Sequence, residues 1–196
     1  MENIKSQQTL IDIDVKQNDL VNLFSLKNNK TLKDTLNTKR YQKFRQDITQ
    51  KYPEYLDWKL GEFLTLLKSQ SNEDYKLFLN KYGDAEFCEF EIKEHLDSKG
   101  LYCFIVDGGI KYIGRCTDNF AKRINNGYGK IHPKNCFVDG QSTNCHINSK
   151  INSKINDSFV VKVGIIKMDD KTTKEIKTYE KKLLSENTFE WNIQKR

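Results

Sequence analysis

The chain has 196 residues, with 33 Lys and Arg against 27 Asp and Glu and a formal net charge of +6; 37% of its residues are hydrophobic, which excludes a disordered chain. The longest apolar run covers residues 101–106, far fewer than the roughly 20 that cross a bilayer, and the N-terminus lacks the pattern of a secretory signal. Five cysteines without a CxxC pair favour reduced thiols, so we expect a cytoplasmic protein without membrane contact.

The first 98 residues predict an all-helical region. Apolar side chains recur at intervals of three and four, and Pro53 suits the first turn of a helix. The helices are expected over residues 20–27, 31–52, 53–67 and 71–82. A shorter amphipathic stretch with Phe90, Ile92 and Leu96 leads to Gly100. We expect this region to dimerise or to contact DNA.

After Gly100 the pattern changes to short strands. Residues 101–106 and 110–113 are rich in β-branched and aromatic side chains, and the Asp-Gly-Gly sequence between them predicts a tight hairpin turn. The following elements are a helix ending at 126, a loop over 127–142, a helix from 143, a strand over 159–166 and a helix over 173–186. The expected fold is α+β: a small three-stranded antiparallel sheet flanked by helices in residues 99–196, preceded by the helical region 1–98.

The positive charge is concentrated in the second half of the chain. Residues 1–99 hold 16 basic and 17 acidic side chains, whereas residues 100–196 hold 17 and 10. Between residues 111 and 134, six basic side chains accompany one acidic residue, Asp118. This patch favours a polyanionic partner, because phosphates attract Lys and Arg. A lysine-rich solvated surface is the alternative.

Two tyrosines stand ten residues apart, one on each arm of the expected hairpin. Tyr102 and Tyr112 flank the turn, so both rings are able to project toward the same end of a small sheet. The alternative for either ring is a place in the core with its hydroxyl at the rim. Gly114 lets the backbone turn sharply after Tyr112 and brings Arg115 and the next helix close.

Arg123 and Glu180 are charged residues whose positions require a partner. Arg123 lies one turn after Phe120, at the border of the buried face of its helix, where its donors face a carboxylate or a phosphate. An ion pair with Asp118, or with an acidic residue of the N-terminal half, is the structural alternative. Glu180 lies within the apolar stripe of the last helix, where a carboxylate needs either a buried pair with Arg123 or a divalent cation.

Together these residues resemble the GIY-YIG nuclease superfamily. Gly100-Leu101-Tyr102 stands where the family has Gly-Ile-Tyr, and Tyr112-Ile113-Gly114 is the second triplet without change. The resemblance covers about half the chain, residues 99–193. Its other elements, in chain order, are the basic pair Lys122-Arg123, the glutamate Glu180 and the terminal Trp191-Asn192.

The resemblance implies the roles of these residues. Tyr102 would be the general base, Arg123 would hold the scissile phosphate, and Glu180 would bind one Mg²⁺ or Mn²⁺ ion per active site. Tyr112 or Tyr128 would pass the proton on, and the neighbouring cations would favour the phenolate of the base. The residues expected to support the active site are Gly114 and Asn192.

The position after the arginine departs from the family pattern. The family has a His or Tyr four residues after the arginine, whereas Gly127 stands there in this chain. Tyr128, one residue later, is the first candidate for this role. His132 is its competitor.

We therefore expect a divalent-metal-dependent endonuclease of restriction type that hydrolyses DNA, most simply double-stranded DNA. The loop over 127–142 would reach phosphates or base edges. The side chains expected to contact the nucleic acid are Arg115, Lys122, Lys130 and Lys134. Two cuts across a duplex from one active site per chain favour a homodimer. The alternatives are a homing or structure-specific nuclease and a non-catalytic nucleic-acid-binding protein on the same scaffold.

Overall fold

The computed structural model describes residues 8–193, which form an α+β protein with two compact units. Of these residues, the first unit takes 8–19, 88–130 and 150–193, and the second takes 20–87 and 131–149. Each unit thus combines segments from both sides of residue 99, whereas the sequence predicts two consecutive regions. No helix in the described part of the chain is long and apolar enough to span a bilayer.

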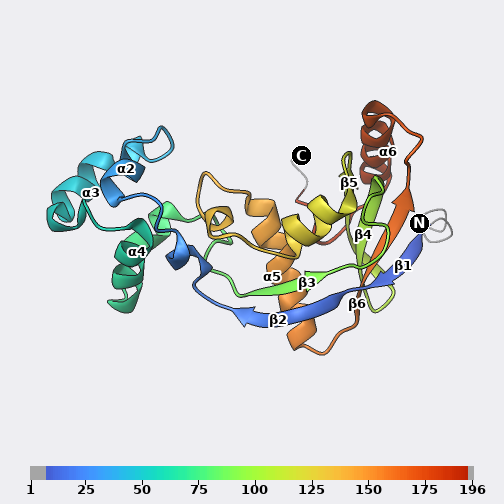
Figure 1. Cartoon of the computed structure of the whole chain (residues 1–196), viewed down its shortest axis with the longest axis horizontal. Coiled ribbons are helices and arrows are strands. Elements are labelled where there is room, and N and C mark those ends of the chain that lie inside the picture. Colours follow the sequence, from blue (N-terminus) through green and yellow to red (C-terminus); the bar gives the residue numbers. More distant parts are fainter. Residues whose placement is uncertain (1–7, 194–196) are drawn as a thin grey trace. The chain divides into compact units, whose positions relative to one another are not determined.

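A four-stranded antiparallel sheet is the centre of the first unit. Its strands lie in the order β1 (Thr9–Asp12), β6 (Val161–Lys167), β4 (Gly100–Val106) and β5 (Gly109–Cys116), as Figure 1 shows. The prediction of three strands is wrong, because β1 pairs with β6 along the edge that the three-stranded sheet would leave open. In β1 Ile11 is buried and its three neighbours are exposed, so apolar alternation does not mark this strand.

The hairpin of β4 and β5 has the turn that the sequence predicts. Asp107 and Gly108 connect the strands and have positive φ values of 46° and 76°. Positive φ at both central residues is typical of a type I′ turn, whose twist matches that of the flanking strands. The register places Tyr102 of β4 opposite Gly114 of β5 on one side and Ile165 of β6 on the other.

The prediction of an all-helical N-terminal region is also wrong. Besides β1, the strand β2 (Asp14–Leu20) lies there and forms a two-stranded sheet with β3 (Phe87–Glu91). The sequence places Phe90 in an amphipathic stretch of the expected helical region, but in β3 it is one of three buried side chains on a paired strand. A few apolar residues at mixed spacing fit both the period of a helix and the period of a strand. The pairing with β2 determines that this segment is a strand.

The second unit contains short helices where the sequence predicts long ones. The helix expected over 31–52 is interrupted between 37 and 41, where the buried Tyr41 donates a hydrogen bond to Oδ1 of Asp139 at 2.8 Å. The helical elements of this unit are η1 (Leu23–Leu26), α2 (Leu32–Leu36), η2 (Gln42–Phe44), α3 (Arg45–Lys51), η3 (Pro53–Tyr55), α4 (Leu60–Ser69), η4 (Glu73–Phe78) and η6 (Pro133–Cys136).

Two helices of the first unit belong to opposite sides of the sheet. The last helix, α6 (Thr173–Glu186), has the predicted bounds, and its side chain Ile176 belongs to one apolar cluster with Ile113 of β5. The π-helix η5 (Ala121–Tyr128) brings Tyr128 against the ring of Tyr102 on the other face. A further helix, α5 (Ser142–Asn156), begins in the second unit and ends in the first.

The segment that follows α6 covers the outer edge of β5. The Trp191 N–H donates to the Lys111 carbonyl at 2.9 Å. The Asn192 side chain then accepts from the Ile113 N–H at 2.9 Å and donates to the Ile113 carbonyl at 2.8 Å. Asn192 therefore pairs with β5 as the backbone of another strand would.

Asn192→Ala is expected to lower the free energy of unfolding by about 1–3 kcal/mol, because both backbone groups of Ile113 lose their partner. Urea denaturation followed by circular dichroism measures this change. The control, Asn37→Ala at the exposed end of α2, should change it by less than about 0.5 kcal/mol. Equal stability of the two variants would contradict the bridging role of Asn192.

Candidate active site

Strands β4 and β5 hold two tyrosines on one face of the sheet. Residues of a strand alternate between its faces, and the side chain of Tyr102 leaves β4 on the side of Phe104 and Phe120. Tyr112 of β5 lies on the same side, with its ring centroid 6.2 Å from that of Tyr102. Tyr102 is 1% exposed and Tyr112 is 8% exposed. The structure therefore brings the two predicted tyrosines together.

The helix η5 supplies Arg123 and Tyr128, and its π geometry explains the unusual spacing between them. The sequence predicts an ordinary helix ending at Asn126, but η5 runs to Tyr128 with hydrogen bonds such as that from the Gly129 N–H to the Ile124 carbonyl, at 2.7 Å. This bond spans five residues, as does the step from Arg123 to Tyr128. One extra residue thus leaves both side chains on the same face of the helix.

Three phenolic hydroxyls and one guanidinium form a single hydrogen-bonded cluster. Tyr128 Oη lies 2.9 Å from Tyr102 Oη and 3.1 Å from Tyr112 Oη. Arg123 donates from Nε to Tyr102 Oη at 2.9 Å and from Nη2 to Tyr128 Oη. The guanidinium carbon also lies 4.6 Å from the centroid of the Tyr128 ring. We call these four side chains the tyrosine cluster.

Burial controls the protonation of the tyrosine cluster. Burial disfavours the phenolate and raises the pKa of Tyr102 above its ordinary value of 10, although Arg123 and the hydrogen bond between Tyr102 and Tyr128 oppose the shift. Burial also raises the pKa of Tyr128, with the neighbouring phenols adding to the effect. Arg123 thus favours the phenolate of Tyr102, as expected, but desolvation is the larger effect and the pKa of Tyr102 is raised overall.

Arg123 is held by hydroxyls and not by a carboxylate. Within residues 8–193 no ion pair joins Arg123 to an acidic side chain, and Asp118, the predicted alternative partner, pairs with Lys122 at 2.7 Å. Neutral oxygens accept from two of the guanidinium donors and leave its charge uncompensated. A partly buried cation of this kind attracts an anion.

Glu180 lies on the other face of the sheet and has a different partner from the one expected. The residue is 8% exposed, and its carboxylate accepts at Oε2 from Nη1 of Arg115. Arg115 follows Gly114, so alternation sends its side chain to the α6 face. The predicted pair between Glu180 and Arg123 is wrong. Instead, β5 separates an Arg115–Glu180 pair from the tyrosine cluster.

Gly114 is the contact point between β5 and the tyrosine cluster. A Cβ atom at this position would lie 2.3 Å from Tyr102 Oη and 2.5 Å from Tyr102 Cζ. These distances are far below van der Waals contact, so only a residue without a side chain lets the Tyr102 hydroxyl lie over β5. The role of Gly114 is to leave room for a ring and not to turn the chain.

The remaining basic residues divide between the two units. Lys122 is exposed and paired with Asp118, and Lys130 lies 3.8 Å from Glu89 in a weak pair. Lys134 and the competitor His132 belong to the second unit, whereas Tyr128 lies within the tyrosine cluster of the first. Of the two candidates after Arg123, Tyr128 is the one that contacts it.

Comparisons of the chain with protein-family models, with curated proteins and with solved structures found no match.

Gly114→Ala is expected to lower the free energy of unfolding by about 1–3 kcal/mol, because the new methyl group overlaps the Tyr102 hydroxyl. Thermal and urea unfolding measure the change. Gly109→Ala on the same strand is the matched control, since the nearest atom to its Cβ, the Val106 carbonyl oxygen, is 3.4 Å away. A Gly114→Ala protein as stable as the control would contradict the close packing of Tyr102 on β5.

Proposed function

We propose that this chain is a divalent-metal-dependent endonuclease that hydrolyses DNA phosphodiester bonds. The observation that supports the proposal is the uncompensated charge of Arg123 beside three hydrogen-bonded phenols. Phosphoryl chemistry requires a cation for the phosphate and a group that handles the proton of the attacking water. Arg123 and Tyr102 are suited to these two tasks, as the resemblance to GIY-YIG nucleases implies.

The proposed task of Arg123 is to bind the scissile phosphate. Its planar guanidinium has five N–H donors, of which the phenols engage two through Nε and Nη2. The other donors are available to phosphate oxygens. A guanidinium fixed by two hydroxyls loses little conformational freedom when the anion arrives, which favours stabilisation of the added negative charge in the transition state.

The proposed task of Tyr102 is to take a proton from the attacking water. A phenol whose pKa is raised by burial is neutral at pH 7, so the phenolate is scarce there. Tyr128 and Tyr112 extend the hydrogen-bonded chain to a side chain that is 8% exposed, and such a chain is able to carry a proton away from the buried end.

Glu180 is the proposed ligand of a Mg²⁺ or Mn²⁺ ion. Within residues 8–193 no group of three or more His, Cys, Asp or Glu side chains is placed to hold a metal. Mg²⁺ needs one or two carboxylates and otherwise uses water and substrate phosphate, so the single carboxylate of Glu180 suits it. Because Arg115 already engages Oε2, the ion would compete with this guanidinium. A bound ion would supply Lewis-acid stabilisation of the phosphate.

A restriction-type enzyme acting on double-stranded DNA is the specific form of the proposal. One active site per chain would cut one strand, so a homodimer would be needed to cut both strands in a single encounter. Arg123 and Arg115 lie on opposite faces of β5. Arg123 would contact the phosphate, and Arg115 would contact the proposed metal ligand, Glu180.

Purified protein is expected to nick supercoiled plasmid in the presence of Mg²⁺, and Arg123→Ala and Glu180→Gln should each reduce the rate about 100-fold or more. Gel electrophoresis of the plasmid measures the rate. The matched control is Glu190→Gln, which removes an exposed carboxylate from its pair with Lys111 and should leave nicking unchanged. Equal nicking by all four proteins would indicate a contaminating nuclease. DNA binding without nicking by any of them would contradict the nuclease and support the alternative of a non-catalytic nucleic-acid-binding protein.

The cleavage rate is expected to rise about tenfold per pH unit between pH 6.5 and 9.5 without a plateau. The reason is that burial raises the pKa of Tyr102, so the phenolate fraction still increases throughout this range. Single-turnover cleavage at saturating Mg²⁺, with circular dichroism as a check on folding, measures the profile. A plateau below about pH 8 would point to a base other than this tyrosine.

A further inference from the structure

The densest positive charge of the chain lies outside the candidate active site, in the second unit. Between residues 27 and 45 there are seven basic side chains and one acidic side chain, Asp34. Asp34 is engaged in the capping box of α2, where its carboxylate accepts from the Thr31 N–H at 3.2 Å. The net charge of this segment is therefore +6, which equals the formal charge of the whole chain.

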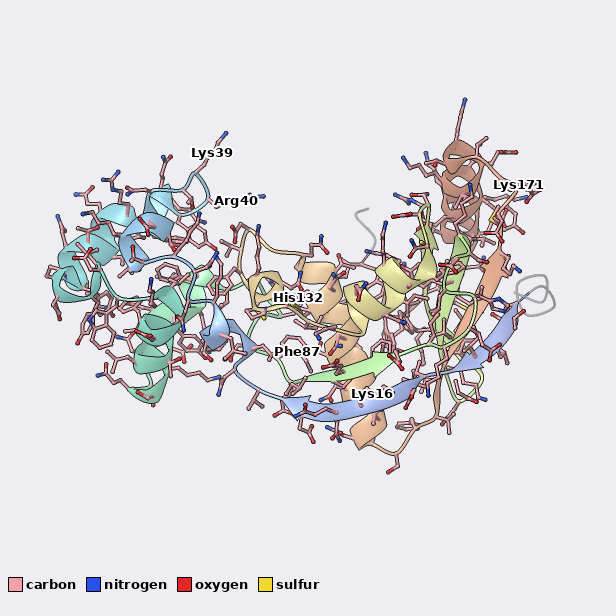
Figure 2. The ribbon with its side chains drawn as sticks, viewed as in Figure 1. Lys16, Lys39, Arg40, Phe87, His132 and Lys171 are labelled. Carbon is pink, nitrogen blue, oxygen red and sulfur yellow. The ribbon has the colours of Figure 1, made fainter. Side chains whose placement is uncertain are left out.

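Six of these cations are exposed and form no ion pair in the described part of the chain. They are Lys30, Lys33, Lys39, Arg40, Lys43 and Arg45. Within residues 8–193 none of them takes part in an ion pair. Lys39 and Arg40 lie on the loop between α2 and η2, and Figure 2 shows both side chains extending away from the ribbon.

The neighbouring helical segment presents amide groups beside this charge. Gln42, Gln46 and Gln50 recur every four residues through η2 and α3, and Arg45 and Thr49 lie between them. These five side chains line one shallow groove, so they share a face of the segment. We call them the amide face. Its composition differs from an ordinary solvated surface, in which Glu and Lys alternate.

Buried anchors fix the segment that carries the amide face. Ile48, on the opposite side of α3, is 2% exposed. Tyr41 precedes η2 and bonds to Asp139, and Tyr52 follows α3 and donates to Oδ2 of Asp74 at 2.7 Å. Both tyrosine rings are buried. A face supported at both ends and in the middle is preorganised for recognition.

We propose that η2 and α3 form a reading segment for double-stranded DNA, with the amide face toward the base edges and the exposed cations toward the phosphates. The choice of DNA as the polyanion rests on the proposed endonuclease function. Gln forms bidentate hydrogen bonds with adenine, and Arg with guanine, in the major groove. The groove is about 12 Å wide and admits a helix, which these ten residues, at about 1.5 Å per residue, are long enough to fill.

The geometry favours a DNA duplex over an RNA duplex. The major groove of A-form RNA is deep and narrow, and side chains do not reach its base edges. Lys39 and Arg40 stand just before the amide face in the chain, and Lys43 follows its first residue, Gln42. There these cations would hold the duplex backbone and fix the register of the reading segment. Glutamines without such cations would supply little affinity, because phosphate contacts dominate it.

The charge arm of the test measures the salt dependence of binding. Full-length protein in EDTA is titrated into a fluorescent pool of 30-base-pair DNA with a randomised centre, and anisotropy is followed. Lys39→Ala, Arg40→Ala and Lys43→Ala combined should weaken binding about tenfold or more and reduce the slope of log K against log salt by about 2–3.

A matched variant removes the same charge from another exposed helix face. Lys174, Lys177 and Lys181 share a face of α6 in the first unit, and their combined change to Ala also removes three positive charges. This variant should keep most of the affinity. Equal loss in the two triple variants would overturn the proposal, because binding would then follow total charge and not the position of the reading segment.

The sequence arm of the test keeps the charge constant. Repeated selection from the randomised pool should enrich a motif with the original protein, and Gln46→Ala with Gln50→Ala should reduce discrimination by about tenfold at one or two base pairs of that motif. An unchanged motif would overturn base reading by the amide face. Equal affinity for a duplex RNA of the same sequence would overturn the major-groove geometry.

The outcome is separable from that of the proposed function. Binding with the expected losses, but without plasmid nicking in Mg²⁺, would refute the nuclease and support the reading segment. Plasmid nicking that the triple variant of Lys39, Arg40 and Lys43 leaves unchanged, together with unchanged binding, would support the nuclease and refute the reading segment.

Discussion

The contact between the guanidinium of Arg123 and two phenolic hydroxyls is the constraint on which the rest of the candidate active site depends. A cation held by neutral oxygens keeps its charge for a ligand, while two hydrogen bonds fix its position. The hairpin register, the missing side chain of Gly114 and the π-helical turn before Tyr128 all serve this contact. Together they leave the four side chains of the tyrosine cluster within hydrogen-bonding distance of one another.

Strand β5 divides the charged groups of the first unit between its two faces. The tyrosine cluster lies on the η5 side, and Arg115 pairs with Glu180 on the α6 side. Each arginine thus has its own environment, one of hydroxyls and one of carboxylate. In the proposed nuclease this separation assigns phosphate binding to Arg123 and metal binding to Glu180. The uncompensated cations of the second unit would then add affinity for the substrate duplex, independently of the chemistry.

Prediction from the sequence succeeded where local patterns are strong. It failed where pairing between distant segments determines the secondary structure. The turn at Asp107-Gly108 follows from residues that tolerate positive φ, and α6 follows from its apolar spacing. Strand β1 has a single buried side chain, so its sequence lacks the alternation of apolar and polar residues that would predict a strand beside β6. Likewise Phe90 suits a helix or a strand until β2 pairs beside it.

The sequence by itself determined that two tyrosines flank a tight turn, that Arg123 borders a buried face, and that Glu180 lies within an apolar stripe that requires a partner for its charge. Only the tertiary structure decided that this partner is Arg115 and that Arg123 meets Tyr128. The physical reason is that partner choice depends on strand alternation and on the extra residue of a π-helix. Neither follows from the identity of the charged residues, because both depend on how the backbone packs.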